Sequence, residues 1–236
     1  MSVTDNIKRI NERVALAAAA AGRAAGEITL VAAAKTNPAS AVREAILAGV
    51  TCVGENRVQE LLAKKAEGAY DGAQVHLIGH LQKNKVKQTV GVADLIQSVD
   101  SAELMRLIHS RAAALGIVQE ILLEVNIGGE ASKSGLSPAA VEETVSLASG
   151  LSHIRLRGLM AIPPVSLEKG GNRPYFAQMC KLFVDIGAKK YDNVSMDFLS
   201  MGMSGDFEDA IAEGSNMIRV GSSLFGARAY PAPGTH

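Results

Sequence analysis

Short β-rich runs alternate with helix-like stretches along almost the whole chain, and this alternation limits the folds that the chain can adopt. Several of the runs are nearly continuously apolar, which is typical of parallel strands covered by helices. Alternating strands and helices predict right-handed βαβ units and a parallel sheet. The expected strands span residues 28–34, 51–56, 75–80, 94–99, 120–127, 154–162, 196–203 and 217–225.

Eight such units in 236 residues predict an α/β fold that closes as a single (β/α)8 barrel of the TIM type. A doubly wound open sheet is the alternative fold. Because α/β barrels of this length commonly form one unit, residues 1–236 are predicted to be a single domain. Residues 1–27 would then be an N-terminal helical extension, and the tail 229–236 is expected to fray.

Helical segments are expected at about 4–22, 38–49, 101–116, 137–150, 173–190 and 204–214. Pro38 and Ser101 are residue types that begin helices, and Gly49 and Gly116 are of the type that ends them. The long polar stretch 163–174 is either a mobile lid or a solvated connection.

The composition narrows the range of partners and compartments. Lys plus Arg and Asp plus Glu both number 24, so the basic excess of a nucleic-acid-binding domain is missing. The first 14 residues are charged and lack the apolar core of a signal peptide, and no run reaches the roughly 18 apolar residues of a membrane span. A cytoplasmic protein is therefore expected. Cys52 and Cys180 lie far apart without metal-ligand spacing, so no metal site is predicted.

Lys35 is the sharpest candidate for chemistry. Active sites of such barrels lie at the C-terminal ends of the strands, and Lys35 closes the first run, ITLVAAA. Desolvation at a buried barrel mouth favours the neutral amine, which is the form that a Schiff base requires. The alternative is a lysine that reaches solvent at the end of a strand.

Two segments near the C-terminus predict a phosphate site. Ser204 is expected as the N-cap of a helix whose free N–H groups could bind an anion, although an ordinary N-cap is the alternative. Gly221 and Ser222 follow the eighth run, and phosphate sites after strands 7 and 8 recur in these barrels. Arg219 either pairs with a carboxylate or contacts a ligand ring. A lysine beside a phosphate site indicates a small phosphorylated aldehyde, and pyridoxal 5′-phosphate (PLP) is the natural candidate.

The chain resembles the pyridoxal phosphate homeostasis proteins in eight motifs. These proteins are related to the N-terminal barrel of alanine racemase. The motifs run in one order from residue 30 to residue 228: LVAAAKTNP (30–38), VGENRVQE (53–60), HLIGHLQKNK (76–85), SVDS (98–101), VNIGGEASKSGL (125–136), RGLMAIPP (157–164), LSMGMSGDFEDAI (199–211) and IRVGSSLFGAR (218–228).

This resemblance implies a role for each candidate residue. Lys35 would carry PLP as a Schiff base, and Arg219 would face the pyridine nitrogen. The remaining cofactor-binding residues would be Ser204, Gly221 and Ser222 around the phosphate, with Asn56 and Lys133 nearby. The sequence departs from the family at Ala34, Asn37 and Ser222, where Ser, Lys and Thr are common; we expect these changes to tune the site and not to abolish it.

The family implies a protein that buffers PLP and hands it to apo-enzymes that depend on PLP. Little turnover and no catalytic residue are expected, because an arginine cannot accept a proton and therefore leaves the pyridine ring neutral. A racemase also needs a second base, and Tyr70, Tyr175, Tyr191 and Tyr230 match no racemase motif. A racemase-like dimer uses a second domain, so a monomer is expected. The alternatives are a weak PLP-dependent racemase and a phosphosugar enzyme in which Lys35 is the base.

Overall fold

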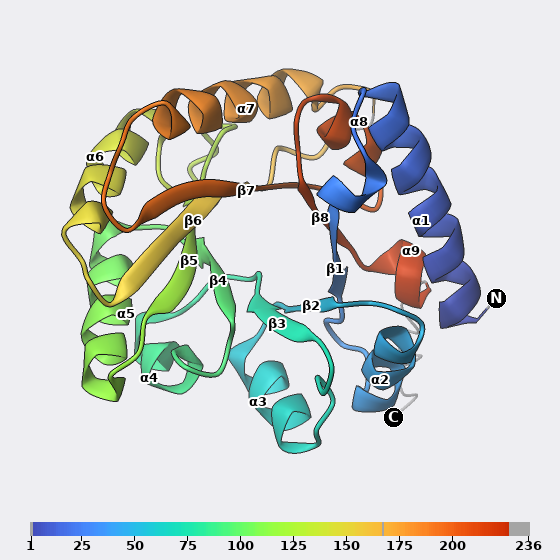
Figure 1. The fold of residues 1–236 in the computed structure, drawn as a ribbon, viewed down its shortest axis with the longest axis horizontal. Helices are drawn as coiled ribbons and strands as arrows, with labels where there is room; N and C mark the ends of the chain where they lie inside the picture. Colours follow the sequence, from blue (N-terminus) through green and yellow to red (C-terminus); the bar gives the residue numbers. More distant parts are fainter. Residues whose placement is uncertain (1, 167, 227–236) are drawn as a thin grey trace, which may run out of the picture.

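Eight parallel strands close into a barrel in the order β1 to β8. The computed structural model describes residues 2–166 and 168–226, so the tail 229–236 lies outside the described residues. Figure 1 looks along the barrel and shows the ring of strands with helices around it. The predicted barrel is confirmed, and the open sheet is excluded because β1 pairs with β8. The strands are β1 (Thr29–Ala33), β2 (Cys52–Glu55), β3 (Gln74–Leu77), β4 (Leu95–Val99), β5 (Gln119–Val125), β6 (Ile154–Ala161), β7 (Val194–Met203) and β8 (Met217–Val220).

Helices cover the outside of the strands, and the predicted ones form within a few residues of their expected bounds. They are α1 (Val3–Ala20), α2 (Ala39–Leu47), α3 (Val58–Ala66), α4 (Val86–Thr89), α5 (Ala102–Leu115), α6 (Pro138–Ser149), α7 (Arg173–Gly187), α8 (Phe207–Ala212) and α9 (Ser222–Phe225), with 3-10 turns η1 (Ala25–Glu27) and η2 (Lys83–Lys85). The helix α3 was not predicted. The buried face of α3 includes a lysine, Lys64. A charged residue on this face interrupts the periodic apolar pattern by which a helix is recognised in a sequence.

The eighth strand is shorter than predicted. β8 ends at Val220, and the residues expected to continue it form α9 instead. Leu224 and Phe225 donate their backbone N–H groups to the Gly221 carbonyl, which closes a helical turn directly after the strand. The apolar residues of SSLF therefore pack as one turn of helix, a pattern that a short apolar run cannot distinguish from a strand.

The N-terminal helix α1 covers the part of the barrel where the last strand, β8, meets the first strand, β1. Figure 1 shows α1 outside β8 and β1, beside the short helices α8 and α9. Ile7, Ile10 and Val14 are buried there, and the buried Asn6 amide donates to the Leu224 carbonyl at 2.9 Å. Since α8 and α9 have only 6 and 4 residues, α1 supplies the apolar cover that a full eighth helix would provide.

Alternation along the strands separates two apolar clusters. Inward-facing residues fill the barrel, whereas the neighbouring positions pack against the helices, as expected for a side-chain period of two. On β1, for example, Val31 and Ala33 face inward while Ala32 faces the helices. The inner cluster consists of Val31, Ala33, Cys52, Ile78, Leu95, Leu122, Met160 and Met217.

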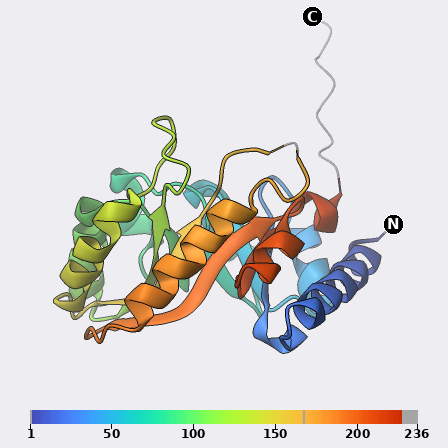
Figure 2. The same ribbon diagram turned by 90° about the horizontal axis from the view of Figure 1, so that it is seen from above.

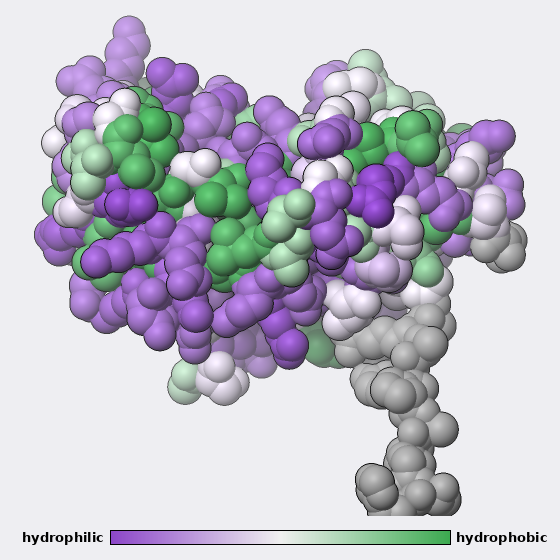
Figure 3. Space-filling model, turned by 90° about the horizontal axis from the view of Figure 1, so that it is seen from below, coloured by the Kyte–Doolittle hydropathy of each residue, from purple (hydrophilic) through white to green (hydrophobic). Residues whose placement is uncertain are grey.

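The molecular surface is largely polar. Figure 3 shows hydrophilic residues over most of one face, with separate hydrophobic groups between them. Among residues 2–166 and 168–226, no helix has the length and apolar character needed to cross a bilayer.

A chain of hydrogen bonds crosses the barrel interior. Arg219 donates to Ser200 Oγ at 2.6 Å, and the Ser200 hydroxyl donates to Gln97 Oε1 at 2.7 Å. The Gln97 amide nitrogen in turn lies 2.9 Å from His76 Nδ1, which accepts this bond when the imidazole is neutral. His76 is thus a packed interior residue. Burial lowers the pKa of His76 to about 4.

Replacing His76 should change how stability depends on pH. An unfolded histidine binds a proton near pH 6.5, whereas folded His76 binds one only near pH 4, so stability is lost as the pH falls through this window. In His76→Gln the decrease between pH 6.5 and pH 4 should be smaller by about 3 kcal/mol. Urea unfolding at the two pH values measures the difference. Equal decreases in the two proteins would contradict a neutral buried His76.

Candidate functional site

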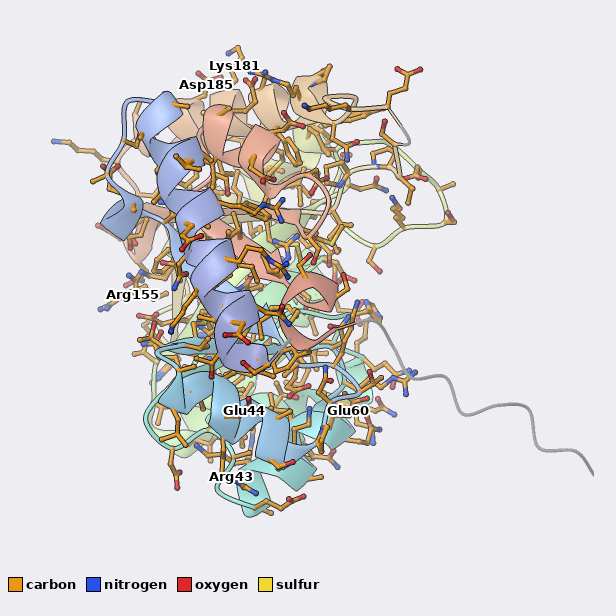
Figure 4. The ribbon with its side chains drawn as sticks, turned by 90° about the vertical axis from the view of Figure 1, so that its right-hand side faces the viewer. Arg43, Glu44, Glu60, Arg155, Lys181 and Asp185 are labelled. Atoms are coloured by element: carbon orange, nitrogen blue, oxygen red, sulfur yellow. The ribbon has the colours of Figure 1, made fainter. Side chains whose placement is uncertain are left out.

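The C-terminal ends of the strands meet at one face of the barrel. In Figure 2 the loops after β5 and β6 rise together from one side of the molecule, at the top of this view. Figure 4 shows the barrel from the side. Arg155 lies at the end of the barrel where the strands begin, and Glu60 lies toward the end where the strands finish. Because all strands run parallel, the residues that follow them converge at this face.

Lys35 lies at this face, two residues beyond the end of β1. It follows the inward-facing residues Val31 and Ala33 as the first residue of a turn, and its side chain is half-buried. Within the described parts of the chain, its amine makes no hydrogen bond or ion pair. A lysine amine that is half-buried and unengaged is available to react with an electrophile.

Ser204 and Gly221 lie next to one another, as the predicted phosphate site requires. The Gly221 N–H donates to Ser204 Oγ at 3.3 Å, although these residues follow different strands. A Cβ atom at position 221 would lie 3.1 Å from the Ala33 carbonyl oxygen, so glycine permits the close approach of β8 to β1. Ala32 pairs with Val220 in the sheet, which brings the ends of β1 and β8 together and Lys35 close to Gly221.

The prediction that Ser204 is the N-cap of a helix is wrong. A turn from Met203 to Asp206 separates it from α8, and Asp206 is the N-cap residue. Asp206 Oδ1 accepts the Met203 N–H at 2.7 Å, and this side-chain bond stabilises the turn. The Ser204 hydroxyl is therefore directed to Gly221 instead of the helix. Ser222 is exposed and begins α9, where the first N–H groups lack acceptors within the helix.

Arg219 is buried inside the barrel. Its guanidinium donates to Ser200 Oγ and, at 2.9 Å, to the Ala161 carbonyl. Burial lowers the pKa of Arg219 to about 10, and the nearby carboxylates of Glu124 and Asp206 oppose this effect. Among the described residues, no carboxylate lies within ion-pair distance of Arg219. Of the two predicted roles, the carboxylate pair is thus not formed, and a ring contact remains open.

Asn56 and Lys133 have different surroundings. Asn56 is half-buried, and its buried side-chain oxygen accepts no hydrogen bond from the residues that the structure describes. Lys133 belongs to the loop after β5, where its amine contacts the Glu130 carboxylate and donates to the Pro163 carbonyl at 3.1 Å. The loop after β5 and the stretch 163–174 therefore touch at Lys133 and Pro163.

Glu124 is a residue at this face that was not predicted. It lies in β5, is buried, and neighbours the charges of Asp100, Arg219 and His80. Burial raises the pKa of its carboxyl group. The available signal in the sequence was a carboxylate placed between Leu123 and Val125, in the middle of the predicted strand 120–127.

Comparison with known proteins identifies the family of the chain. Residues 6–229 match the family described as "Alanine racemase, N-terminal domain". A Pseudomonas aeruginosa relative named pyridoxal phosphate homeostasis protein is 41% identical over 233 residues, which is 98% of this chain and 98% of the relative.

Two solved structures are also similar. A protein of unknown function from Bifidobacterium adolescentis has a TM-score of 0.90 and 40% identity, and the match covers 94% of each chain. PipY of Synechococcus elongatus, solved with PLP bound, has a TM-score of 0.79 and 36% identity, and the match covers 92% of this chain and 100% of PipY. The chain therefore belongs to the alanine racemase N-terminal domain family and, within it, to the pyridoxal phosphate homeostasis proteins.

Proposed function

We propose that this protein binds PLP and serves its homeostasis, with Lys35 forming a covalent link to the aldehyde carbon. The observation that carries the proposal is the free amine of Lys35 at the end of β1, beside the Ser204–Gly221 pair that follows β7 and β8. In this assignment Ser204, Gly221 and Ser222 hold the phosphate. The PLP-bound structure of PipY and the names of the relatives support the same ligand.

The residues at the face fit such a ligand. Lys35 offers an amine that has no partner among the described residues, and Ser204 and Ser222 offer hydroxyl groups. Gly221 approaches Ala33 closely, and Ala33 is two residues before Lys35. The buried side-chain oxygen of Asn56 can accept a hydrogen bond from a ligand. Together these groups can bind an aldehyde, a phosphate and one further polar group.

PLP supplies an aldehyde that condenses reversibly with amines and a ring that can accept electrons. The chain controls these properties through Arg219, which we place opposite the pyridine nitrogen. Arg219 can only donate hydrogen bonds, and Ser200 and Ala161 already orient its guanidinium. It cannot keep the pyridine nitrogen protonated as a carboxylate does, so the ring remains a weak electron acceptor.

Turnover also requires a second base opposite Lys35, and the described tyrosines do not supply one. The Tyr70 hydroxyl donates to Glu55 at 3.0 Å, on the helix side of the barrel wall. Tyr191 lies before β7, at the opposite end of the barrel, with its hydroxyl 3.4 Å from Glu142. Tyr175 packs against the outer apolar cluster. These positions favour binding over racemisation. We also infer a monomer and a cytoplasmic protein that passes PLP to apo-enzymes.

Lys35→Ala should abolish covalent binding of PLP, because it removes the amine that we propose forms the Schiff base. Wild-type protein incubated with PLP should turn yellow, and borohydride reduction should leave a pyridoxyl group on Lys35 that mass spectrometry locates. Lys87→Ala, which removes an exposed lysine, is the matched control and should behave as wild type. A pyridoxyl group on another lysine in the wild-type protein would refute the assignment.

Ser204→Ala should weaken binding of PLP by about 10-fold, since one hydrogen bond to a charged phosphate is lost. Binding of pyridoxal, which lacks the phosphate, should not change. Titrations of both aldehydes followed by absorbance give the two ratios. The matched control is Ser110→Ala, an exposed serine on α5. An equal loss for PLP and pyridoxal would remove Ser204 from the phosphate site.

The PLP-loaded protein should transfer its cofactor without catalysing exchange at Cα. In heavy water, alanine incubated with it should gain deuterium no faster than with free PLP, because Arg219 does not support a carbanion. Proton NMR of the Cα position measures this rate, with an alanine racemase as positive control. Exchange that depends on Lys35 would establish the racemase alternative.

The same loaded protein should activate an apo-transaminase faster than an equal amount of free PLP does. Activation at the rate of free PLP would limit the proposed role to buffering. A phosphosugar enzyme would bind no PLP in any of these experiments.

A further inference from the structure

We propose that helix α3 positions the Lys35 amine by holding the backbone on both sides of it, through Lys64 and Glu60. The inference rests on the proposed covalent role of Lys35. Lys64 bonds to the residue before Lys35, and Glu60 bonds to the residue after it. Both act as positioning residues, since each bonds to the backbone beside Lys35 and not to the Lys35 amine.

Lys64 anchors the backbone before Lys35. Its amine donates to the Ala34 carbonyl at 2.9 Å and to Glu55 Oε1 at 2.7 Å. Glu55 is fully buried, and the buried Tyr70 hydroxyl donates to the same carboxylate oxygen at 3.0 Å. A buried ammonium group is costly without partners, so these bonds keep Lys64 in one position against Ala34.

The strand alternation explains why this cluster lies outside the barrel. Cys52 faces the interior and Glu55 is three positions further along β2, so its side chain is directed to the helices. Ala34 belongs to the outer cluster that faces the helices, whereas Val31 and Ala33 face inward. Lys64 therefore holds the Ala34 carbonyl, immediately before Lys35, from the helix side of the barrel wall.

Glu60 anchors the backbone after Lys35. Its carboxylate accepts the Thr36 N–H at 3.0 Å. Thr36 has a φ of 62°, a left-handed conformation that a β-branched residue adopts only when its surroundings impose it. A charged acceptor aimed at the Thr36 N–H is such a constraint. Without it, the turn can relax and the Lys35 Cα–Cβ direction changes with it.

Both anchors come from one helical turn of α3. Glu60 and Lys64 are four residues apart, so they lie on the same face of the helix. The short turn with Lys35 at its centre is thus fixed at two points by one rigid element. An amine held in its reactive direction pays less entropy on binding, which raises both affinity and the rate of bond formation.

Glu60→Ala tests the proposal, because its half-buried side chain can be removed without leaving a charge in the core. In protein without PLP, hydrogen exchange followed by NMR should show the Thr36 amide exchanging about 10-fold faster than in wild type. In protein with PLP, borohydride trapping on Lys35 should show about 10-fold weaker binding. Glu60→Gln, which keeps a carbonyl acceptor for the Thr36 N–H, should restore most of both values.

Two controls separate the hydrogen bond from other effects of the substitution. Glu44→Ala removes an exposed carboxylate from the neighbouring helix α2, and Figure 4 labels both glutamates. Arg57→Ala removes the exposed arginine that lies 3.9 Å from Glu60. Both variants should match wild type in exchange and in trapping. A loss in Arg57→Ala equal to that in Glu60→Ala would assign the effect to this ion pair and overturn the proposal.

The Lys64 anchor needs a paired substitution, because Lys64→Met alone would leave the Glu55 carboxylate buried and unpaired. Lys64→Met combined with Glu55→Gln removes both charges and should weaken trapping on Lys35 by a further factor of about 10. If wild type is trapped normally, and both this double variant and Glu60→Ala are trapped as well as wild type, the positioning role of α3 is overturned. The proposed binding of PLP to Lys35 would still stand. A wild-type protein that takes up no PLP overturns the proposed function, and the inference with it.

Discussion

Closure of the parallel barrel is the constraint on which the rest of the structure depends. Pairing of β1 with β8 brings the first and last strands together, and with them Lys35 and Gly221. Because every strand runs in the same direction, their C-terminal ends share one face. The side-chain period of two then decides which residues meet inside the barrel and which meet the helices. An open sheet of the same strands would leave Lys35 and the phosphate residues on different edges.

Two buried cations lie on opposite sides of the barrel wall. Arg219 is inside, where Ser200 and the Ala161 carbonyl satisfy its guanidinium. Lys64 is outside, where Glu55 and the Ala34 carbonyl satisfy its amine. Buried charges are tolerated only with such partners, and the partners restrict each cation to one position. Both cations are therefore held in fixed positions near the face at which we propose that PLP binds.

The same groups support our proposal that this barrel of the racemase family favours binding over turnover. A Lys amine and a phosphate site are sufficient for reversible covalent attachment of an aldehyde. Turnover needs more, namely a protonated ring and a second base, and Arg219 and the positions of the described tyrosines provide neither. Reversible attachment at the open end of a barrel suits a protein that stores a reactive aldehyde and releases it.

Much of the fold could be predicted from the sequence, because strand alternation and helix termini are local signals. The eight strands, the helix α1 and the position of Lys35 after an apolar run all follow from such signals. The failures have physical reasons as well. The buried Lys64 hides the apolar face of α3, and the run SSLF is too short to distinguish a helical turn from a strand.

The sequence by itself thus determined the barrel and the residue types that close its strands. Only the tertiary structure decided which of them meet. Ser204 bonds to Gly221 and not to its own helix, Arg219 bonds to Ser200 and not to a carboxylate, and α3 holds the backbone around Lys35. These contacts join residues on different strands and helices, so they exist only once the barrel has closed.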